Sequence, residues 1–189
     1  MIGKKNIVFG FFFLVLTAGL GPVMVQMYQD WGAANGEKQQ RVGHLQQLKA
    51  GDWEEDPETL DELDAKALAV SNAEAILAMN AVAAQEFAID YIKGGPHAHG
   101  NLEALLNIAV GLTLGFLAVS VWLKQLISWS FILGTLLHSG LLYLERVFQV
   151  EWAAALLNTG IGPILILLGL LLMGMAVGMG FRGRWVEER

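Results

Sequence analysis

The chain has 189 residues, of which 54% are hydrophobic and 16% are charged, and its mean hydropathy is +0.48. It carries 12 basic and 18 acidic residues, for a formal net charge of −6, and no cysteine. These values exclude a disordered chain, a disulfide-stapled mini-domain and an ordinary nucleic-acid-binding protein. Soluble domains are about 45–50% apolar and about 25% charged, so the composition indicates a membrane protein.

Four charge-free apolar windows are long enough to cross a bilayer, because about 20 helical residues span a hydrocarbon core of roughly 30 Å. The windows are residues 6–29, 104–123, 125–144 and 152–181. The first lacks a small-residue cleavage site and is longer than a usual signal-peptide core, so we predict a retained span. The last is long enough to tilt or to project from the bilayer. The short connection near Lys124 predicts that the second and third spans form an antiparallel hairpin.

Basic residues near the span ends predict the orientation. Lys4, Lys5, Lys124, Arg182 and Arg184 fall on one side of a four-span chain, which should be cytoplasmic. We therefore predict a multi-pass protein of the cell inner (plasma) membrane with both termini in the cytoplasm. The predicted divisions are a first span at 1–29, an extracytoplasmic segment at 30–100, three spans at 101–181 and a tail at 182–189.

The extracytoplasmic segment is acidic and predicted to be helical. It holds 13 acidic and 5 basic residues. A short amphipathic helix is expected at 37–49, between glycine breakers, and a longer one at 57–92, with Asp56 as its cap and Pro57 in its first turn. Within the longer helix, apolar residues recur at spacings of three and four, and the predicted buried stripe is Leu60, Leu63, Ala67, Val70, Leu77, Ala81, Ala84, Ala88 and Tyr91. Most other faces are also apolar, so this helix should pack against the spans or another subunit.

Glycine and proline within the spans suggest close packing and kinks. The spacing Gly174-x-x-x-Gly178 allows helices to approach closely, either within one bundle or between subunits. Pro22 and Pro163 lie in or near spans, where kinks are expected. The predicted fold is therefore an all-α integral membrane four-helix bundle with a helical extracytoplasmic insert between the first two spans.

Three histidines are candidates for chemistry. His97 and His99 precede the second apolar window, and His138 lies inside the third, seven residues before Glu145 and hence about 10 Å below the outer surface. An ionisable side chain at membrane depth is costly and is usually functional, and imidazole is a common ligand of metals and of heme iron. If the second and third spans are neighbours, the three imidazoles can approach one site in the outer leaflet. The alternative is that His138 is neutral and donates a single hydrogen bond to a neighbouring helix, with no ligand bound.

Further polar residues follow the histidine pair. Glu103 and Asn107 share one helix face, and Tyr143 lies about one turn above His138. A carboxylate near these histidines can bind a metal directly or orient an imidazole from behind. The sequence therefore also predicts a divalent copper or zinc site made of His97, His99, His138 and Glu103.

The second half of the chain contains a series of short motifs, which are Gly95-Pro-His-Ala-His-Gly, Leu105-Leu-Asn-Ile-Ala-Val-Gly, Leu133-Gly-Thr, Gly140-Leu-Leu-Tyr143, Gly160-Ile-Gly-Pro163 and Met173-Gly-Met-Ala-Val-Gly178. Through these motifs it resembles the styrene oxide isomerase family of small four-span membrane enzymes. The resemblance implies a trimer that holds heme b in the membrane, with a ferric iron that acts as a Lewis acid and opens an epoxide to an aldehyde. By this resemblance His99 or His97 would be the axial ligand, and Asn107 and Tyr143 would position the epoxide.

The sequence departs from that family at several points. A histidine pair replaces a single histidine, the spacing from His99 to Asn107 is longer, and His138 is additional and could occupy the second axial position. The alternative function is that of a non-enzymatic accessory or scaffold subunit, whose outer helix docks a partner in a membrane complex.

Overall fold

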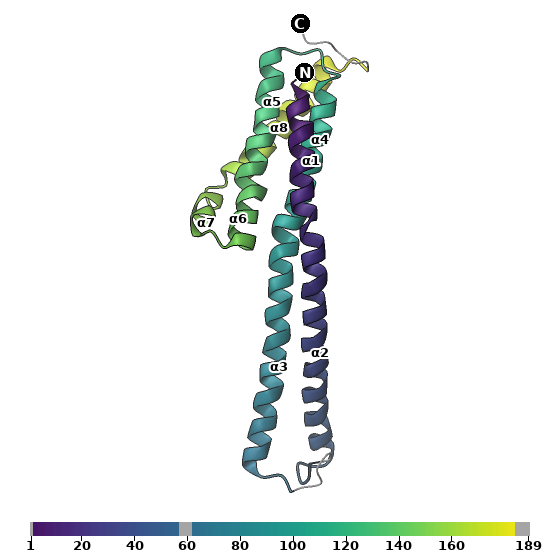
Figure 1. Ribbon diagram of the computed structural model, residues 1–189, viewed down its shortest axis with the longest axis vertical. Coiled ribbons are helices and arrows are strands. Elements are labelled where there is room, and N and C mark those ends of the chain that lie inside the picture. Colours follow the sequence, from purple (N-terminus) through teal and green to yellow (C-terminus); the bar gives the residue numbers. More distant parts are fainter. Residues whose placement is uncertain (1, 57–61, 184–189) are drawn as a thin grey trace. The chain divides into compact units, whose positions relative to one another are not determined.

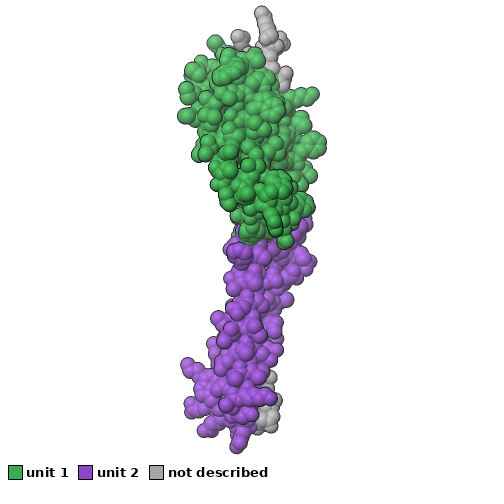
Figure 2. Space-filling view, turned by 90° about the vertical axis from the view of Figure 1, so that its left-hand side faces the viewer, with its two compact units in different colours: residues 1–21, 91–189 green, residues 22–90 purple. Residues whose placement is uncertain are grey.

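The computed structural model describes residues 2–56 and 62–183, and within these ranges it is helical, with two isolated β-bridges and no β-strand. The predicted all-α fold is confirmed. The start of the helix expected at 57–92 and the end of the predicted tail at 182–189 lie outside the described residues. The chain divides into two compact units, residues 1–21 with 91–189, and residues 22–90 (Figure 2).

The first unit is a bundle of helices from four candidate spans (Figure 1). Its helices are α1 (Gly3–Ala18), α4 (Ala98–Leu114), α5 (Val121–Thr135), α6 (Leu141–Phe148), α7 (Glu151–Leu157) and α8 (Ile161–Gly180), and two π-helical segments, η1 (Lys93–His97) and η2 (Leu136–Gly140), precede α4 and α6. The length and apolarity of the four helical stretches make this a membrane-embedded helical bundle.

The hairpin between the second and third spans lies earlier in the chain than predicted. Helix α4 ends at Leu114, and α5 starts at Val121 with Ser120 as its cap, whose hydroxyl accepts a hydrogen bond from the Leu123 amide at 3.3 Å. The predicted turn at Lys124 is therefore wrong. Lys124 is buried in the first turn of α5 because an N-cap serine, and not the charged residue, sets the helix start. The second span moves toward the N-terminus, and the histidine pair becomes part of a helix instead of a loop.

The fourth apolar window is two helices and not one long span. The short helix α7 ends at Leu157, and Gly160 has a φ of 70°, a left-handed conformation that breaks the helix before α8. Pro163 lies in the first turn of α8, and Pro22 lies in the first turn of α2 (Leu20–Ala50). Proline is tolerated in a first turn because the amide that it lacks has no partner there. A helix boundary precedes each proline, at Gly19 and at Gly160.

Helices α1 and α4 pack at very short distance through glycines. A Cβ atom at Gly111 would lie 2.6 Å from the Gly3 carbonyl oxygen, and one at Gly10 would lie 2.6 Å from the Ala104 carbonyl oxygen. Glycines of α5 and α8 make a similar contact, since a Cβ at Gly134 would lie 2.7 Å from Ile166. In contrast, Gly174 of the predicted small-residue motif has no atom within 4 Å, and neither has Gly178. This motif therefore does not mediate packing inside the described chain.

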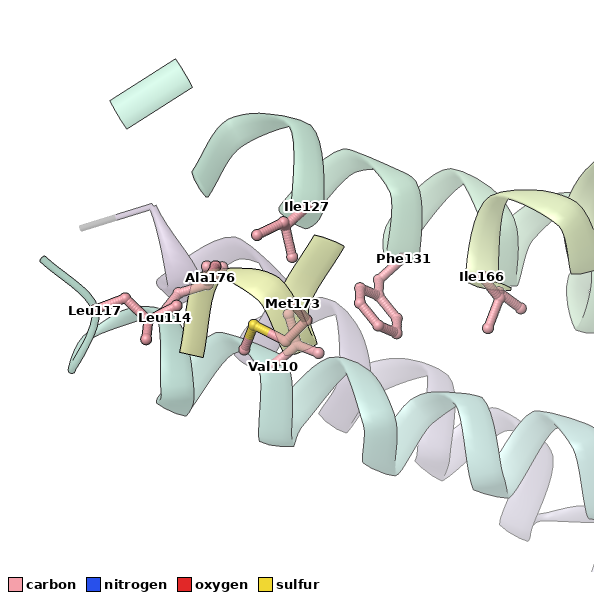
Figure 3. Packing of buried hydrophobic residues seen from close by; sticks show 8 residues of the cluster. All are labelled: Val110, Leu114, Leu117, Ile127, Phe131, Ile166, Met173 and Ala176. Carbon is pink, nitrogen blue, oxygen red and sulfur yellow. The ribbon is translucent and has the colours of Figure 1, made fainter. Parts of the chain in front are cut away.

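The apolar core of this unit joins α4, α5 and α8. Figure 3 shows side chains from all three helices and from the α4–α5 connection converging on one cluster, which consists of Val110, Leu114, Leu117, Ile127, Phe131, Ile166, Met173 and Ala176. Phe131 is the largest of them and is 1% exposed. This core aligns α4, which carries His99 and Glu103, with α5, which leads directly into η2 and His138.

The second unit is made of the facing parts of α2 and α3 (Ala65–Ile92). The helix predicted at 37–49 exists, but α2 continues through Gly32, Gly36 and Gly43, so these glycines do not break it. Each costs about 1 kcal/mol relative to alanine, which packing against α3 offsets. Helix α3 starts at Ala65, where Asp64 accepts a hydrogen bond from the Ala67 amide at 2.6 Å, so Asp64 and not Asp56 caps it.

The buried face of α3 differs from the predicted stripe. Val70 and Leu77 of that stripe are 48% and 66% exposed, whereas the buried positions are Ala75, Ala78, Val82 and Ile89. The first three of these positions are three and four residues apart and Ile89 follows seven residues later, which is the spacing of a coiled-coil seam. Since α3 is apolar on most faces, periodicity alone could not identify the face that α2 covers. Within the second unit, α3 pairs with α2.

Replacing Gly111 with alanine should destabilise the bundle by about 1–3 kcal/mol, because the added methyl group overlaps the backbone of α1. Gly174→Ala is the matched control, and should be neutral or slightly stabilising because nothing lies near it and alanine favours a helix. Reversible unfolding of purified protein in mixed micelles, followed by circular dichroism, measures both. Equal stability of the two variants would contradict the packing described here.

Candidate metal centre

Two π-helical segments shape the backbone around the candidate site. His97 ends η1 and His138 lies within η2. In η1, Gly95 has non-helical dihedral angles (φ −97°, ψ −107°), and a Cβ atom there would overlap the side chain of Arg146. A π-helical turn shifts the register of the side chains that follow it, and such turns are frequent at functional sites. The chain is therefore kinked at Gly95, two residues before His97, whereas His138 lies within an unbroken π-helical segment.

Three of the predicted residues form one cluster between α4 and η2. His99, Glu103 and His138 each offer one ligand atom, and these atoms all lie within 4.8 Å of one another. The His138 Nδ1 atom is 2.5 Å from Glu103 Oε1, and the His99 and His138 rings are 5.0 Å apart between centroids and inclined by 63°. His99 and Glu103 are one helical turn apart on α4, so their side chains project from the same face.

Glu103 is the most buried member of the cluster. It is 4% exposed, and its Oε2 atom has no hydrogen-bond partner among the described residues. Burying a carboxylate is costly unless it is paired, and an unpaired buried oxygen adds to that cost. The contact with His138 satisfies only one of the two oxygens. The second oxygen is therefore available for a cation or a proton at this site.

His99 provides access to the cluster. Its side chain is exposed in the monomer, as are Leu102 and Leu105 on the same helix, at 57% and 53%. A ligand set with one buried carboxylate, one half-buried imidazole and one exposed imidazole leaves one side open. An open side is typical of catalytic metal sites, whereas structural sites are closed by four protein ligands.

His97 lies apart from the cluster, and its contacts are with α1 and with its own helix. Its Nδ1 atom is 3.1 Å from the Thr17 carbonyl oxygen, and its Nε2 atom is 3.5 Å from the amide nitrogen of Asn101. The Thr17 hydroxyl donates to Asn101 Oδ1 at 2.8 Å. These contacts link the end of α1 to the start of α4. The histidine pair therefore divides, with one ring toward α1 and the other toward His138.

Asn107 is fully buried in a polar network that links three helices. It accepts a hydrogen bond from Asn6 of α1 at 3.0 Å, and it donates to the Glu103 carbonyl oxygen at 3.0 Å and to the Thr135 hydroxyl at 2.9 Å. Asn6 also donates to the Ser128 carbonyl oxygen at 3.1 Å and accepts from the Ser128 hydroxyl. The amide of Asn107 is thus occupied within the bundle.

Tyr143 is not a member of this cluster, and the centroid of its ring lies 5.6 Å from that of the Phe148 ring. In contrast, three network residues, Asn6, Ser128 and Thr135, were not singled out in the sequence. The available signal was their polarity inside otherwise apolar windows, because a polar side chain at membrane depth needs a partner on another helix.

Comparison with known proteins found no match: no family model, no curated protein and no solved structure matches the chain. Function is therefore argued from the site itself.

The network predicts a structural role for Asn107 that a double-mutant cycle can measure. Asn6→Ala and Asn107→Ala should each destabilise the bundle by about 1–3 kcal/mol, because each leaves buried polar partners unsatisfied. The double variant should cost less than the sum, since the two residues share a hydrogen bond. Unfolding in mixed micelles measures the cycle. Additive effects would show that the two amides act independently.

Proposed function

We propose that this chain is a membrane-embedded metalloprotein that binds one divalent transition-metal ion through His99, Glu103 and His138. The observation that carries the proposal is the convergence of the three ligand atoms within 4.8 Å around a buried carboxylate oxygen that lacks a partner. Two imidazoles and a carboxylate are a common ligand set for zinc and for non-heme iron. A bound metal would give Glu103 Oε2 a partner, which this oxygen lacks among the described residues.

The ligand set supports Lewis-acid chemistry on a lipophilic substrate. A metal with an open position polarises an oxygen atom that binds to it. Leu102, one turn from His99 on α4, and Leu105, three residues further on, are exposed and give this part of the helix an apolar surface. The chemistry implied by the family resemblance, opening of an epoxide without net redox change, is of this kind, and a small aryl epoxide is the first substrate to test. Formation of an aldehyde by metal-loaded protein, lost in the His99→Ala variant, would establish an isomerase.

Heme b is the second candidate for the bound group. The exposed His99 ring and the neighbouring leucines would suit a single axial ligand beside an apolar porphyrin. Two axial imidazoles lie on opposite faces of a porphyrin, whereas the His99 and His138 rings are in edge-to-face contact, at 5.0 Å. This geometry favours adjacent ligands on a bare ion over a bis-histidine heme. An absorption spectrum of protein purified from its native membrane tests the heme directly through its Soret band.

The distribution of basic residues supports a plasma-membrane topology with both termini in the cytoplasm. Lys4 and Lys5 lie in the first turn of α1, and Arg182 follows α8. Within the first unit, Figure 1 shows the start of α1, the start of α5 and the end of α8 at the same end of the bundle. Cytoplasmic loops are enriched in lysine and arginine, so this end is proposed to face the cytoplasm, with the cluster in the opposite leaflet.

Metal binding can be tested by substitution of the three cluster residues, with substitution of His97 as the control. His99→Ala, His138→Ala and Glu103→Gln should each lower the affinity for zinc by at least the roughly 10–100-fold that loss of a supporting residue costs. His97→Ala should keep the affinity, because His97 lies only two residues from His99 but contacts α1. Calorimetric titration of full-length protein in detergent, with metal content measured by mass spectrometry, gives both values.

Equal zinc affinity in wild type and His99→Ala would overturn the proposal, provided that circular dichroism shows both proteins folded. A loss of binding in His97→Ala equal to that in His99→Ala would place the ligands elsewhere. Binding should also weaken as the pH falls, since imidazole and carboxylate bind metal in their deprotonated forms.

A further inference from the structure

A cavity lies within the α2–α3 unit, and its chemistry differs from that of the histidine cluster. It has a volume of about 270 Å³ and is lined by Tyr28, Trp31, Glu86, Ile89 and Asp90. This volume is below the roughly 300–1,000 Å³ of pockets that enclose drug-sized ligands, so the cavity suits a small group.

The two walls of the cavity are chemically distinct. Tyr28 and Trp31 are three residues apart on α2 and form an aromatic wall. Glu86 and Asp90 are four residues apart on α3 and form an acidic wall. Ile89 between the walls is 4% exposed and makes an apolar floor. Aromatic faces and carboxylates share one preferred ligand, which is a cation with an apolar or weakly hydrated surface.

One hydrogen bond joins the two walls. The indole nitrogen of Trp31 donates to Glu86 Oε1 at 3.2 Å. It holds the aromatic ring beside the carboxylate, as a cation site requires. The two carboxylates, one turn apart on the same helix face, also repel each other, and a bound cation would remove that cost.

The position of the aromatic wall in the chain indicates where the cation would come from. Tyr28 lies at the end of the first apolar window and Trp31 lies just after it, next to the first charged residue, Asp30. Tyrosine and tryptophan gather at the depth of lipid headgroups. Aromatic anchoring alone does not need an acidic partner, and carboxylates are disfavoured near lipid phosphates. A headgroup that carries an ammonium group would account for the two carboxylates of the acidic wall at this depth.

We propose that the cavity between Tyr28, Trp31, Glu86 and Asp90 binds an organic ammonium group. Its carboxylates pair with the positive charge, and its aromatic rings cover the carbon-bound surface. The headgroups of zwitterionic phospholipids and free small amines share this chemistry. This site is independent of the proposed metal centre, since none of its residues belongs to the histidine cluster.

Tryptophan fluorescence of the full-length protein tests the proposal in two arms. In detergent, the protein is titrated with ethanolammonium chloride and with tetramethylammonium chloride, with sodium chloride as the ionic-strength reference. In nanodiscs, phosphatidylethanolamine is compared with phosphatidylglycerol. A specific change in fluorescence is expected in at least one arm, and it should be absent from Trp31→Phe, which assigns the signal to this site. A response in the nanodisc arm alone identifies the lipid headgroup, and a response in detergent alone identifies a free amine.

Charge-removing variants provide the decisive comparison. The double variant Glu86→Gln/Asp90→Asn should bind at least tenfold more weakly than wild type. Asp30→Asn removes a carboxylate beside Trp31 that pairs with Gln26 and does not line the cavity, so it should bind as wild type does. Asp90→Asn alone, at an exposed position, replaces the double variant if the latter loses helical content. Equal binding by the carboxylate variants, or no response beyond sodium chloride in either arm, would overturn the proposal.

Discussion

The buried carboxylate of Glu103 is the feature on which the candidate site depends. An apolar bundle has no water to solvate a charge, so such a group must be paired with a proton, an imidazole or a metal ion. The contact with His138 supplies one partner across the helix interface, and Oε2 is left without one among the described residues. A bundle selected only for packing would have an apolar residue here, because a buried ion pair is often no more stable than a hydrophobic one. The presence of a buried carboxylate, despite its cost in stability, points to a function for the Glu103 side chain.

Close helix packing holds this carboxylate in place. Glycines bring the backbone of α1 against α4, and the buried amides of Asn6 and Asn107 then meet at 3.0 Å. Asn107 in turn donates to the Glu103 carbonyl oxygen one turn away, and to Thr135 just before η2. The same side chain therefore connects the turn that carries Glu103 with the helix that carries His138. Lipid offers no hydrophobic drive for helix association, so small residues and interhelical hydrogen bonds are the forces available for this arrangement.

The sequence could predict much of the fold because charge-free windows and capping residues act locally. It located four apolar stretches and a helical insert, and it singled out His99, Glu103 and His138. It predicted the hairpin between the second and third spans but misplaced its turn, because the residues just before Val121 are nearly as apolar as the spans themselves. It misassigned the buried face of α3 for a related reason: Val70 and Leu77 are as apolar as the residues that pack on α2, and only the partner helix decides which face is covered.

The sequence also gave no sign that the His97 and His99 rings point to different helices. Their directions depend on the η1 segment, which ends at His97. Within that segment, Gly95 leaves space that the Arg146 side chain occupies. Arg146 also donates to the Tyr91 carbonyl oxygen at 2.8 Å and lies 4.3 Å from the centre of the Tyr91 ring, while Tyr91 donates to Glu145 at 2.6 Å. These contacts tie α6 to the helical turn before η1. Because α6 directly follows η2, these contacts join the chain just after His138 to the chain just before His97.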